Sequence, residues 1–211
     1  MKVLLVNGSP HKNGSTNRAL EEVAATLEKE GVEAEIFWIG AKPIGGCMGC
    51  HKCGEIKKCV LDDVVNEARE KAYAADGFVF GSPVHYAGLA GNMASFMDRL
   101  FFSEFIGNEN KAFRLKPAAS VVSARRSGTT SAFSQMNKYF TVQEMIVVSS
   151  RYWNMVHGMD AKEVEKDEEG LCNMRVLARN MAYILKCKDA AEKAGVVLPE
   201  KETPVFTNFI R

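Results

Sequence analysis

The sequence has almost no excess charge of either sign. It contains 27 lysines and arginines against 26 aspartates and glutamates, which leaves a formal net charge of +1. A surface that binds nucleic acid or an anionic membrane normally needs a clear positive excess. The sequence also lacks any run of about 18 apolar residues, the length that a membrane-spanning helix requires. We therefore expect neither a nucleic-acid partner nor a membrane partner.

A secretory signal is missing as well. The opening stretch, MKVLLVNGSP, is apolar only as far as Val6, and Asn7 ends the run. A signal peptide needs a longer apolar region followed by small residues at a cleavage site. This predicts a cytoplasmic protein. In that compartment, clustered cysteines are more often metal ligands or redox groups than structural disulfides.

Familiar nucleotide-binding and catalytic motifs are also absent. The first turn has no Gly-Lys pair followed by Ser or Thr, and no G-x-G-x-x-G is present. The loops that bind nucleoside triphosphates and dinucleotides are thereby excluded. No acid–base triad is apparent, and the histidines show no metal-ligand spacing; they are His11, His51, His85 and His157.

What the sequence does have is a regular alternation of strand and helix patterns. Its composition, 46% hydrophobic and 25% charged, is that of a globular protein, and we expect one domain over residues 1–211. Strands are predicted at 2–6, 32–39, 77–83, 116–124 and 144–150, and helices at 16–30, 62–75, 89–100, 130–140 and 171–194. This order predicts an α/β fold, a doubly wound five-stranded parallel sheet with helices on both faces. Ligands of such sheets bind at the carboxyl ends of the strands.

The loop after the first predicted strand, NGSPHKNGSTN (7–17), is typical of an anion site. Glycines and hydroxyl groups there precede a predicted helix, whose first backbone N–H groups lack partners within the helix. A phosphate group fits such a loop. An ordinary Gly/Ser turn with a helix cap is the alternative reading.

Together with a second segment, GSPVHYAGLAGNMASFMDR (81–99), this loop resembles the flavodoxin-like NADPH-dependent FMN reductase family. The resemblance extends along nearly the whole chain. It implies a flavodoxin-like fold and an FMN-dependent oxidoreductase that uses NAD(P)H to reduce a flavin, a quinone or a similar small acceptor. It also implies a homodimer or homotetramer, and no catalytic side chain, because the flavin carries the chemistry.

The resemblance assigns the FMN contacts residue by residue. The phosphate ligands would be Ser9, His11, Ser15, Thr16 and Asn17. His11 stands where the family often has arginine, so it would hold a phosphate dianion less firmly. The flavin ring would lie against Pro83, Val84, His85 and Tyr86. The loop after the fourth strand would face its pyrimidine side through Ser123, Arg125, Arg126 and Gly128. There an arginine would favour the anionic reduced flavin or meet the phosphate of NADPH.

Four of the six cysteines lie in one predicted loop, 43–62, with the spacing C-x2-C-x2-C-x5-C. This compact motif resembles that of the iron–sulfur flavoproteins and implies a [4Fe–4S] cluster on Cys47, Cys50, Cys53 and Cys59. The alternative is a set of reduced thiols. In that case Lys52, Lys57 and Lys58 would lower the thiol pKa values and make the thiols sensitive to oxidants.

Two other functions remain open. One is an electron carrier of the flavodoxin or iron–sulfur flavoprotein type, which passes electrons to a redox protein; the other is a sensor that responds through its thiols. An extended C-terminal tail is expected at 198–211, with large apolar residues suited to docking on the body or on a partner subunit. Asp98 and Arg99 are expected to be structural charges at a helix end.

Overall fold

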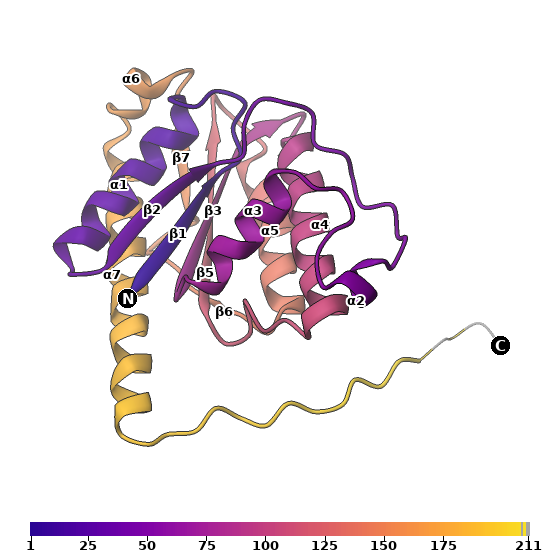
Figure 1. Ribbon diagram of the computed structural model, residues 1–211. Coiled ribbons are helices and arrows are strands. Elements are labelled where there is room, and N and C mark those ends of the chain that lie inside the picture. The colour runs from indigo at the N-terminus through magenta and orange to yellow at the C-terminus, as the bar shows by residue number, and fades with distance from the viewer. Residues whose placement is uncertain (208, 210–211) are drawn as a thin grey trace.

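The computed structural model describes residues 1–207 and residue 209, and its centre is a mostly parallel β-sheet (Figure 1). The main path of the sheet has the order β2-β1-β3-β5-β6. These strands are β1 (Lys2–Asn7), β2 (Glu33–Trp38), β3 (Gly77–His85), β5 (Pro117–Ala124) and β6 (Ile146–Val147). β7 (Met155–His157) pairs parallel to β5, and β4 (Gly88–Leu89) pairs antiparallel to β3. The predicted α/β fold with a parallel sheet is confirmed.

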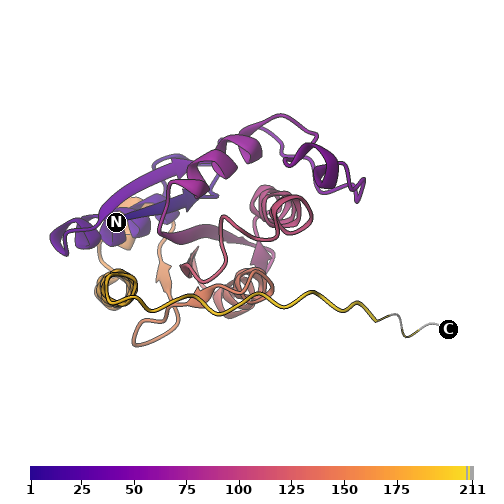
Figure 2. The same cartoon turned by 60° about the horizontal axis from the view of Figure 1, so that its bottom comes forward.

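Helices cover both faces of this sheet (Figures 1 and 2). α1 (Ser15–Lys29) and α7 (Glu168–Lys193) pack on one face. α3 (Val64–Tyr73), α4 (Gly91–Asn108) and α5 (Thr129–Val142) pack on the other. Two one-turn helices, α2 (Cys53–Ile56) and α6 (Ala161–Val164), lie in connecting segments. None of the described helices is both long enough and apolar enough to cross a membrane.

Each face has its own apolar core, because side chains alternate between the two faces of a strand. From β1, Val3 and Leu5 point toward α1 and α7, while Leu4 and Val6 point toward the other helices. β5 is buried along its whole length. A strand covered on both faces is mostly apolar, and this pattern made β5 predictable.

The fifth strand is where the prediction was wrong. A strand was expected over 144–150, yet only Ile146 and Val147 pair with β5 there. The chain then leaves the sheet and returns as β7 beside the carboxyl end of β5. The excursion ends at buried Asn154, whose carbonyl accepts a hydrogen bond from the Val122 N–H at 2.9 Å. The last sheet position is thus shared by two short strands.

After α7, the described part of the chain forms no further helix or strand. This segment runs across the end of the sheet and past α5, away from the body (Figures 1 and 2). Arg114 donates to the Pro199 carbonyl at 3.1 Å, and Lys201 donates to the Glu109 carbonyl at 2.5 Å. The predicted tail, 198–211, includes residues 208, 210 and 211, which lie outside the described residues.

Candidate functional site

A cavity of about 410 Å³ opens at the carboxyl ends of β1, β3 and β5. Four segments that are far apart in sequence line it, at the strand ends where a doubly wound sheet binds its ligands. Of the residues predicted from the sequence, those that line the cavity are Ser9, His11, Ser15, Thr16, Pro83, Val84, His85, Ser123 and Arg125. The predicted residues that do not line it are Asn17, Tyr86, Arg126 and Gly128.

Asn7, fully buried at the end of β1, holds the first loop in shape. Its side-chain oxygen accepts from the Ser9 N–H at 3.0 Å, and its amide donates to the Lys12 carbonyl at 3.1 Å. The same amide donates to the side-chain oxygen of Asn17 at 3.1 Å. Asn17 is therefore part of the scaffold beneath the loop, which explains why it does not face the cavity.

The N-terminus of α1 faces the cavity without a side-chain cap. Gly14 occupies the N-cap position, and the first turn carries no acidic residue. The first amides of a helix have no intrahelical acceptor, and the helix dipole is positive at this end. The hydroxyl groups of Thr16 and Ser123 lie 2.8 Å apart and connect the helix to the end of β5. This arrangement suits an anion such as a phosphate group.

β3 extends two residues beyond the predicted strand and forms a tight hairpin with β4. Val84 pairs with Leu89 and His85 with Gly88, so Pro83, Val84 and His85 lie on strand rather than in an irregular loop. The two turn residues, Tyr86 and Ala87, have φ values of 47° and 61°. Positive φ at both central positions is the geometry of a two-residue hairpin turn. It directs the Tyr86 side chain fully into solvent.

The segment after β5 presses against this hairpin at Gly128. Its φ of +95° is a backbone conformation that glycine adopts readily. A Cβ at this position would lie 2.6 Å from the Cα of Ala87 and 2.9 Å from the Cγ1 of Val84. Gly128 thus permits the close approach of the two backbones, as expected from the sequence. Arg126, two residues earlier, is exposed.

Five residues that line the cavity were not predicted: Gly14, Ala124, Gly158, Met159 and Asp160. The last three follow β7, which was missed because the fifth strand was expected to end at residue 150. Asp160 caps α6, since its side chain accepts from the Glu163 N–H at 2.9 Å. The spacing of Asp160 and Glu163 is a helix-start pattern that was available in the sequence.

The four clustered cysteines line a second, small cavity beside α4. Cys53 is buried at the start of α2, Cys59 is half-buried, and Cys47 and Cys50 are exposed. As they are placed, no three His, Cys, Asp or Glu side chains of the described residues form a group that would hold a metal ion. The thiols therefore converge on one space without the arrangement of a preformed metal site.

Arg99 fixes this cysteine loop to α4. Its guanidinium donates to Asp63 at 2.7 and 2.9 Å and to the Leu61 carbonyl at 2.7 Å. Its Nε also donates to the Cys59 sulfur at 3.2 Å. The arginine was expected at a helix end, but it lies in the middle of α4, with its side chain 1% exposed. Its role is to anchor the loop.

The lysines of the loop do not lower the pKa of Cys53. Burial raises that pKa, and the nearby thiols of Cys50, Cys47 and Cys59 raise it further, since a second negative charge close by is unfavourable. Lys52 pairs with Glu55 at 3.3 Å and Lys58 with Asp62 at 3.6 Å. The expectation of a lysine-activated thiol is therefore wrong for Cys53.

Comparison with solved structures shows the fold. A structure of RosB with bound 8-demethyl-8-formylriboflavin-5'-phosphate matches with a TM-score of 0.69 at 16% identity, over 100% of this chain and 94% of that one. A flavodoxin from the domain Archaea matches with a TM-score of 0.57 at 18% identity, over 88% and 99% of the two chains. At these identities the likeness is one of fold, and that fold is flavodoxin-like.

Sequence comparison shows the family. The family model described as NADPH-dependent FMN reductase matches residues 1–160. An iron–sulfur flavoprotein of Methanocaldococcus jannaschii is 30% identical over 191 residues, which is 88% of this chain and 98% of that protein. An iron–sulfur flavoprotein of Methanosarcina thermophila is 24% identical over 88% of this chain and 96% of that protein. This chain therefore belongs to the NADPH-dependent FMN reductase family, close to the iron–sulfur flavoproteins.

Proposed function

We propose that the protein is an FMN-dependent oxidoreductase that takes electrons from NAD(P)H and reduces a flavin, a quinone or a similar small acceptor. The observation that carries this proposal is the uncapped N-terminus of α1, which opens into the same cavity as the ends of β3 and β5. One cavity thereby offers an anion site and, a short distance away, walls for a flat ring. Family membership supports the same cofactor.

The phosphate end of FMN would be held by the first turn of α1. The backbone amides of this turn and the hydroxyl of Ser15 face the cavity, while His11 and Arg125 line it with basic side chains. Helix dipole, amide donors and a fixed arginine charge all favour a bound dianion. Asn17 contributes by holding the Asn7 side chain rather than by direct contact.

The ring of the flavin would lie beside the β3–β4 hairpin. Pro83 and Val84 offer apolar surface, and the tight turn at Tyr86 and Ala87 keeps this wall in place. Ser123 is the neighbour of Pro83 across the sheet, at the end of β5, and its hydroxyl is fixed by Thr16. When bound, FMN accepts a hydride and passes on one or two electrons. The chain's own part is to bind, orient and enclose this group.

Titration of the purified protein with FMN and with riboflavin tests the binding site. We expect FMN to bind at least 100-fold more tightly, because riboflavin lacks the phosphate that the helix N-terminus holds. Anaerobic mixing with NADPH and with NADH should then bleach the absorbance of the bound flavin. A protein that binds neither flavin, or that binds both equally, contradicts the proposed site.

A second candidate function is electron transfer through a [4Fe–4S] cluster on Cys47, Cys50, Cys53 and Cys59. All four thiols line one cavity, and thiolates are the usual ligands of such clusters. The buried Arg99 places a positive charge and an N–H donor at the Cys59 sulfur, which suits an anionic group there. The type and number of the ligands fit the cluster, although the thiols would have to move closer together to hold it; the cluster would supply one-electron transfer beside the flavin site.

Anaerobic purification followed by iron and sulfide analysis tests this second candidate. We expect about four irons per chain, lost in Cys53→Ser and retained in Cys172→Ser, whose thiol lies in α7 away from the loop. Fewer than about one iron per chain would leave the cysteines as thiols. In that event the reductase proposal stands alone, since the flavin site contains none of these cysteines.

A further inference from the structure

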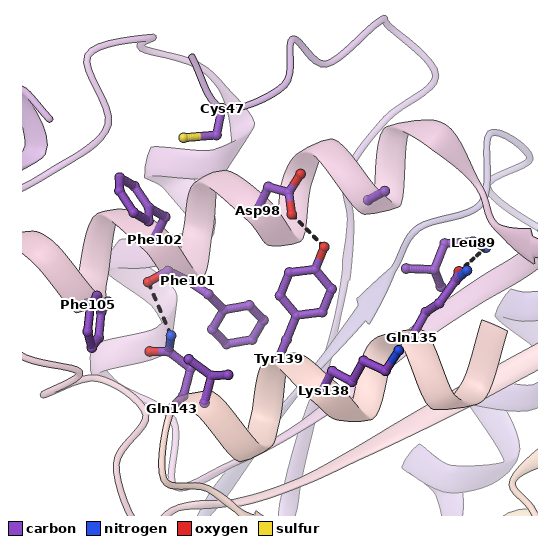
Figure 3. A pocket seen from close by; sticks show the side chains of 12 residues that line it. Cys47, Leu89, Asp98, Phe101, Phe102, Phe105, Gln135, Lys138, Tyr139 and Gln143 are labelled. Atoms are coloured by element: carbon purple, nitrogen blue, oxygen red, sulfur yellow. Dashed lines mark hydrogen bonds between the residues drawn. The ribbon is translucent and has the colours of Figure 1, made fainter. Parts of the chain in front are cut away.

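An apolar groove of about 750 Å³ runs between α4 and α5 and reaches Leu89 of the β3–β4 hairpin at one end (Figure 3). Its walls include Phe101, Phe102 and Phe105 of α4 and Tyr139 and Val142 of α5. Val142 is 65% exposed, which is high for a valine on a packed helix. Nothing in the described part of the chain covers this surface.

Apart from Lys138 and Cys47, the polar side chains along the groove already bind other groups of the chain, so the groove offers mainly apolar contacts. The Tyr139 hydroxyl donates to Asp98 at 2.5 Å, and the Gln135 oxygen accepts from the Leu89 N–H at 3.0 Å (Figure 3). Gln143, 3% exposed, donates its amide to the Phe101 carbonyl at 3.4 Å. Its side-chain oxygen is buried and has no partner among the described residues. An occupant of the groove would therefore be apolar and would bring an N–H donor.

The C-terminal tail has these properties. Val205, Phe206 and Phe209 are 88%, 80% and 93% exposed, on a segment that projects beyond the body in both views (Figures 1 and 2). An extended segment outside any sheet also has backbone N–H groups free to donate. Three large apolar side chains held in water on one short segment are unfavourable unless another surface covers them.

The dimensions of tail and groove agree. Along α4 the groove extends from Ala94 to Phe105, which is about 16 Å at the rise of an α-helix. Phe209 lies four residues after Val205, and four residues of extended chain reach about 13 Å. The tail would thus place its apolar side chains along most of the groove.

The tail's own groove is an unfavourable target. Lys201 is bound to Glu109, just past the end of α4, so the chain would have to turn sharply after Lys201 and run back along α4 to enter that groove. Pro204 follows Thr203, and a residue before proline is held extended. In the structure the chain continues outward at this point (Figure 2). A groove on another molecule requires no reversal.

We propose that the tail of one copy of this chain occupies the α4–α5 groove of a second copy, and that the two copies exchange tails. Burial of two Phe and one Val side chain removes on the order of 400–500 Å² per tail from water. With the groove surface that each tail covers, two such contacts reach about 1,600–2,000 Å², the size of a stable protein–protein interface. A symmetric exchange also closes on itself and leaves neither tail uncovered.

Light scattering coupled to size-exclusion chromatography tests the exchange, at protein concentrations from about 1 µM to about 100 µM. The wild type is expected to be a dimer. The tail variant F206S/F209S and the groove variant V142E are each expected to weaken the dimer at least 100-fold, because each removes both contacts. Val197→Ser is the matched control: Val197 is 86% exposed but precedes the docking segment, and its loss should change nothing.

A mixing experiment separates exchange between copies from docking within one chain. The tail variant keeps an intact groove, and the groove variant keeps an intact tail. Mixed in equal amounts, with an affinity tag on one of them, they should form a heterodimer that neither forms alone. Circular dichroism should show the same spectrum for each variant as for the wild type, and equal unfolding temperatures for the two variants, which excludes a folding defect.

Three outcomes overturn the proposal. A wild type that is monomeric at 100 µM has no exchanged interface. A tail variant that dimerises as tightly as the wild type shows that another surface holds the copies together. Variants that lower the unfolding temperature without changing the mass, and that do not associate when mixed, would show that the tail covers its own groove.

Discussion

Arg99 of α4 and Cys59 of the cysteine loop, 40 positions apart, meet in a contact of 3.2 Å from guanidinium nitrogen to sulfur. Two bonds to Asp63 and one to the Leu61 carbonyl hold the same guanidinium in place. A single side chain thus ties a segment of little regular structure to a long helix. The pKa of Arg99 is raised despite its burial, because Asp63 and Cys59 both favour its charged form. Arg99 therefore remains a cation beside the thiols.

Replacement of this arginine should loosen the loop. Arg99→Gln is expected to lower the free energy of unfolding by about 3 kcal/mol, since it removes the charge that pairs with Asp63 and the donor to the Leu61 carbonyl. Urea denaturation measures the loss, and limited proteolysis should show earlier cleavage within 43–62. Arg126→Gln, a change at an exposed arginine, is the control and should stay within about 0.5 kcal/mol of the wild type. Equal stabilities of the two variants would contradict the anchoring role.

A carboxylate introduced at the N-terminus of α1 should weaken FMN binding without lowering the stability of the fold. In Ser15→Asp, the new charge repels a bound phosphate, so the dissociation constant for FMN is expected to rise at least 100-fold. The constant for riboflavin should change little. The same charge interacts favourably with the helix dipole, so the free energy of unfolding should not fall. Fluorescence titration and thermal unfolding measure the two effects, with Ser15→Asn as the neutral control. Weaker binding of both flavins alike would argue against a phosphate at this helix.

Gly128 should tolerate no side chain. Gly128→Ala combines an unfavourable φ of +95° with the clash against Ala87, and we expect it to lower the free energy of unfolding by about 2–3 kcal/mol. Gly40→Ala is a close control, because Gly40 has a φ of +88° with nothing within 4 Å of its added Cβ. Gly40→Ala should lower the free energy of unfolding only through backbone strain, by about 1 kcal/mol. Denaturation of both variants tests the difference, and equal losses would exclude the clash as a cause.

The hydrogen bond from Tyr139 to Asp98 should make stability depend on pH at the alkaline end. Burial, and then the hydrogen bond to Asp98 and its charge, raise the pKa of Tyr139 well above its ordinary value. A tyrosine in the unfolded chain ionises near pH 10, so the unfolded state loses its proton first as the pH rises. The contribution of this hydrogen bond to the free energy of unfolding is therefore complete below about pH 10 and is lost gradually as the pH rises further.

Tyr139→Phe removes this group, so the difference between the unfolding temperatures of wild type and variant should be constant from about pH 9 to pH 10 and should begin to narrow by about pH 11. Asp98→Asn keeps an acceptor for the hydroxyl but removes the charge, and it should behave in an intermediate way. A constant difference between wild type and Tyr139→Phe across this range would show that Tyr139 does not titrate differently in the two states.

The sequence predicted β1, β3 and β5 because each is a mostly apolar run, and a strand buried on both faces needs that composition. β2 lies at the edge of the sheet and carries Glu33 and Glu35 among its apolar residues. The last sheet position was missed for a physical reason. Apolar residues from Met145 to Val148 have the pattern of a strand, but pairing with β5 stops after Val147. Local pattern cannot show that the chain leaves the sheet and returns at Met155. Gly158, Met159 and Asp160 were lost from the predicted site for the same reason.

The loop residues of the site were predictable from residue type, while their orientations were not. Tyr86 was expected beside the ring, but the hairpin turn directs it into solvent. Asn17 was expected at the phosphate, but Asn7 holds its side chain. Each difference arises from a tertiary contact that short sequence motifs do not encode.

The division of the last sheet position into β6 and β7 has a consequence for how molecules meet. An exposed border strand normally presents a row of unpaired amides and carbonyls on which another chain can add a strand, and ordered aggregates begin in this way. Here that border consists of pieces of two and three residues. Neither is long enough to template a growing sheet. Self-recognition through backbone pairing is thereby disfavoured at this border, and contacts between molecules are left to side chains.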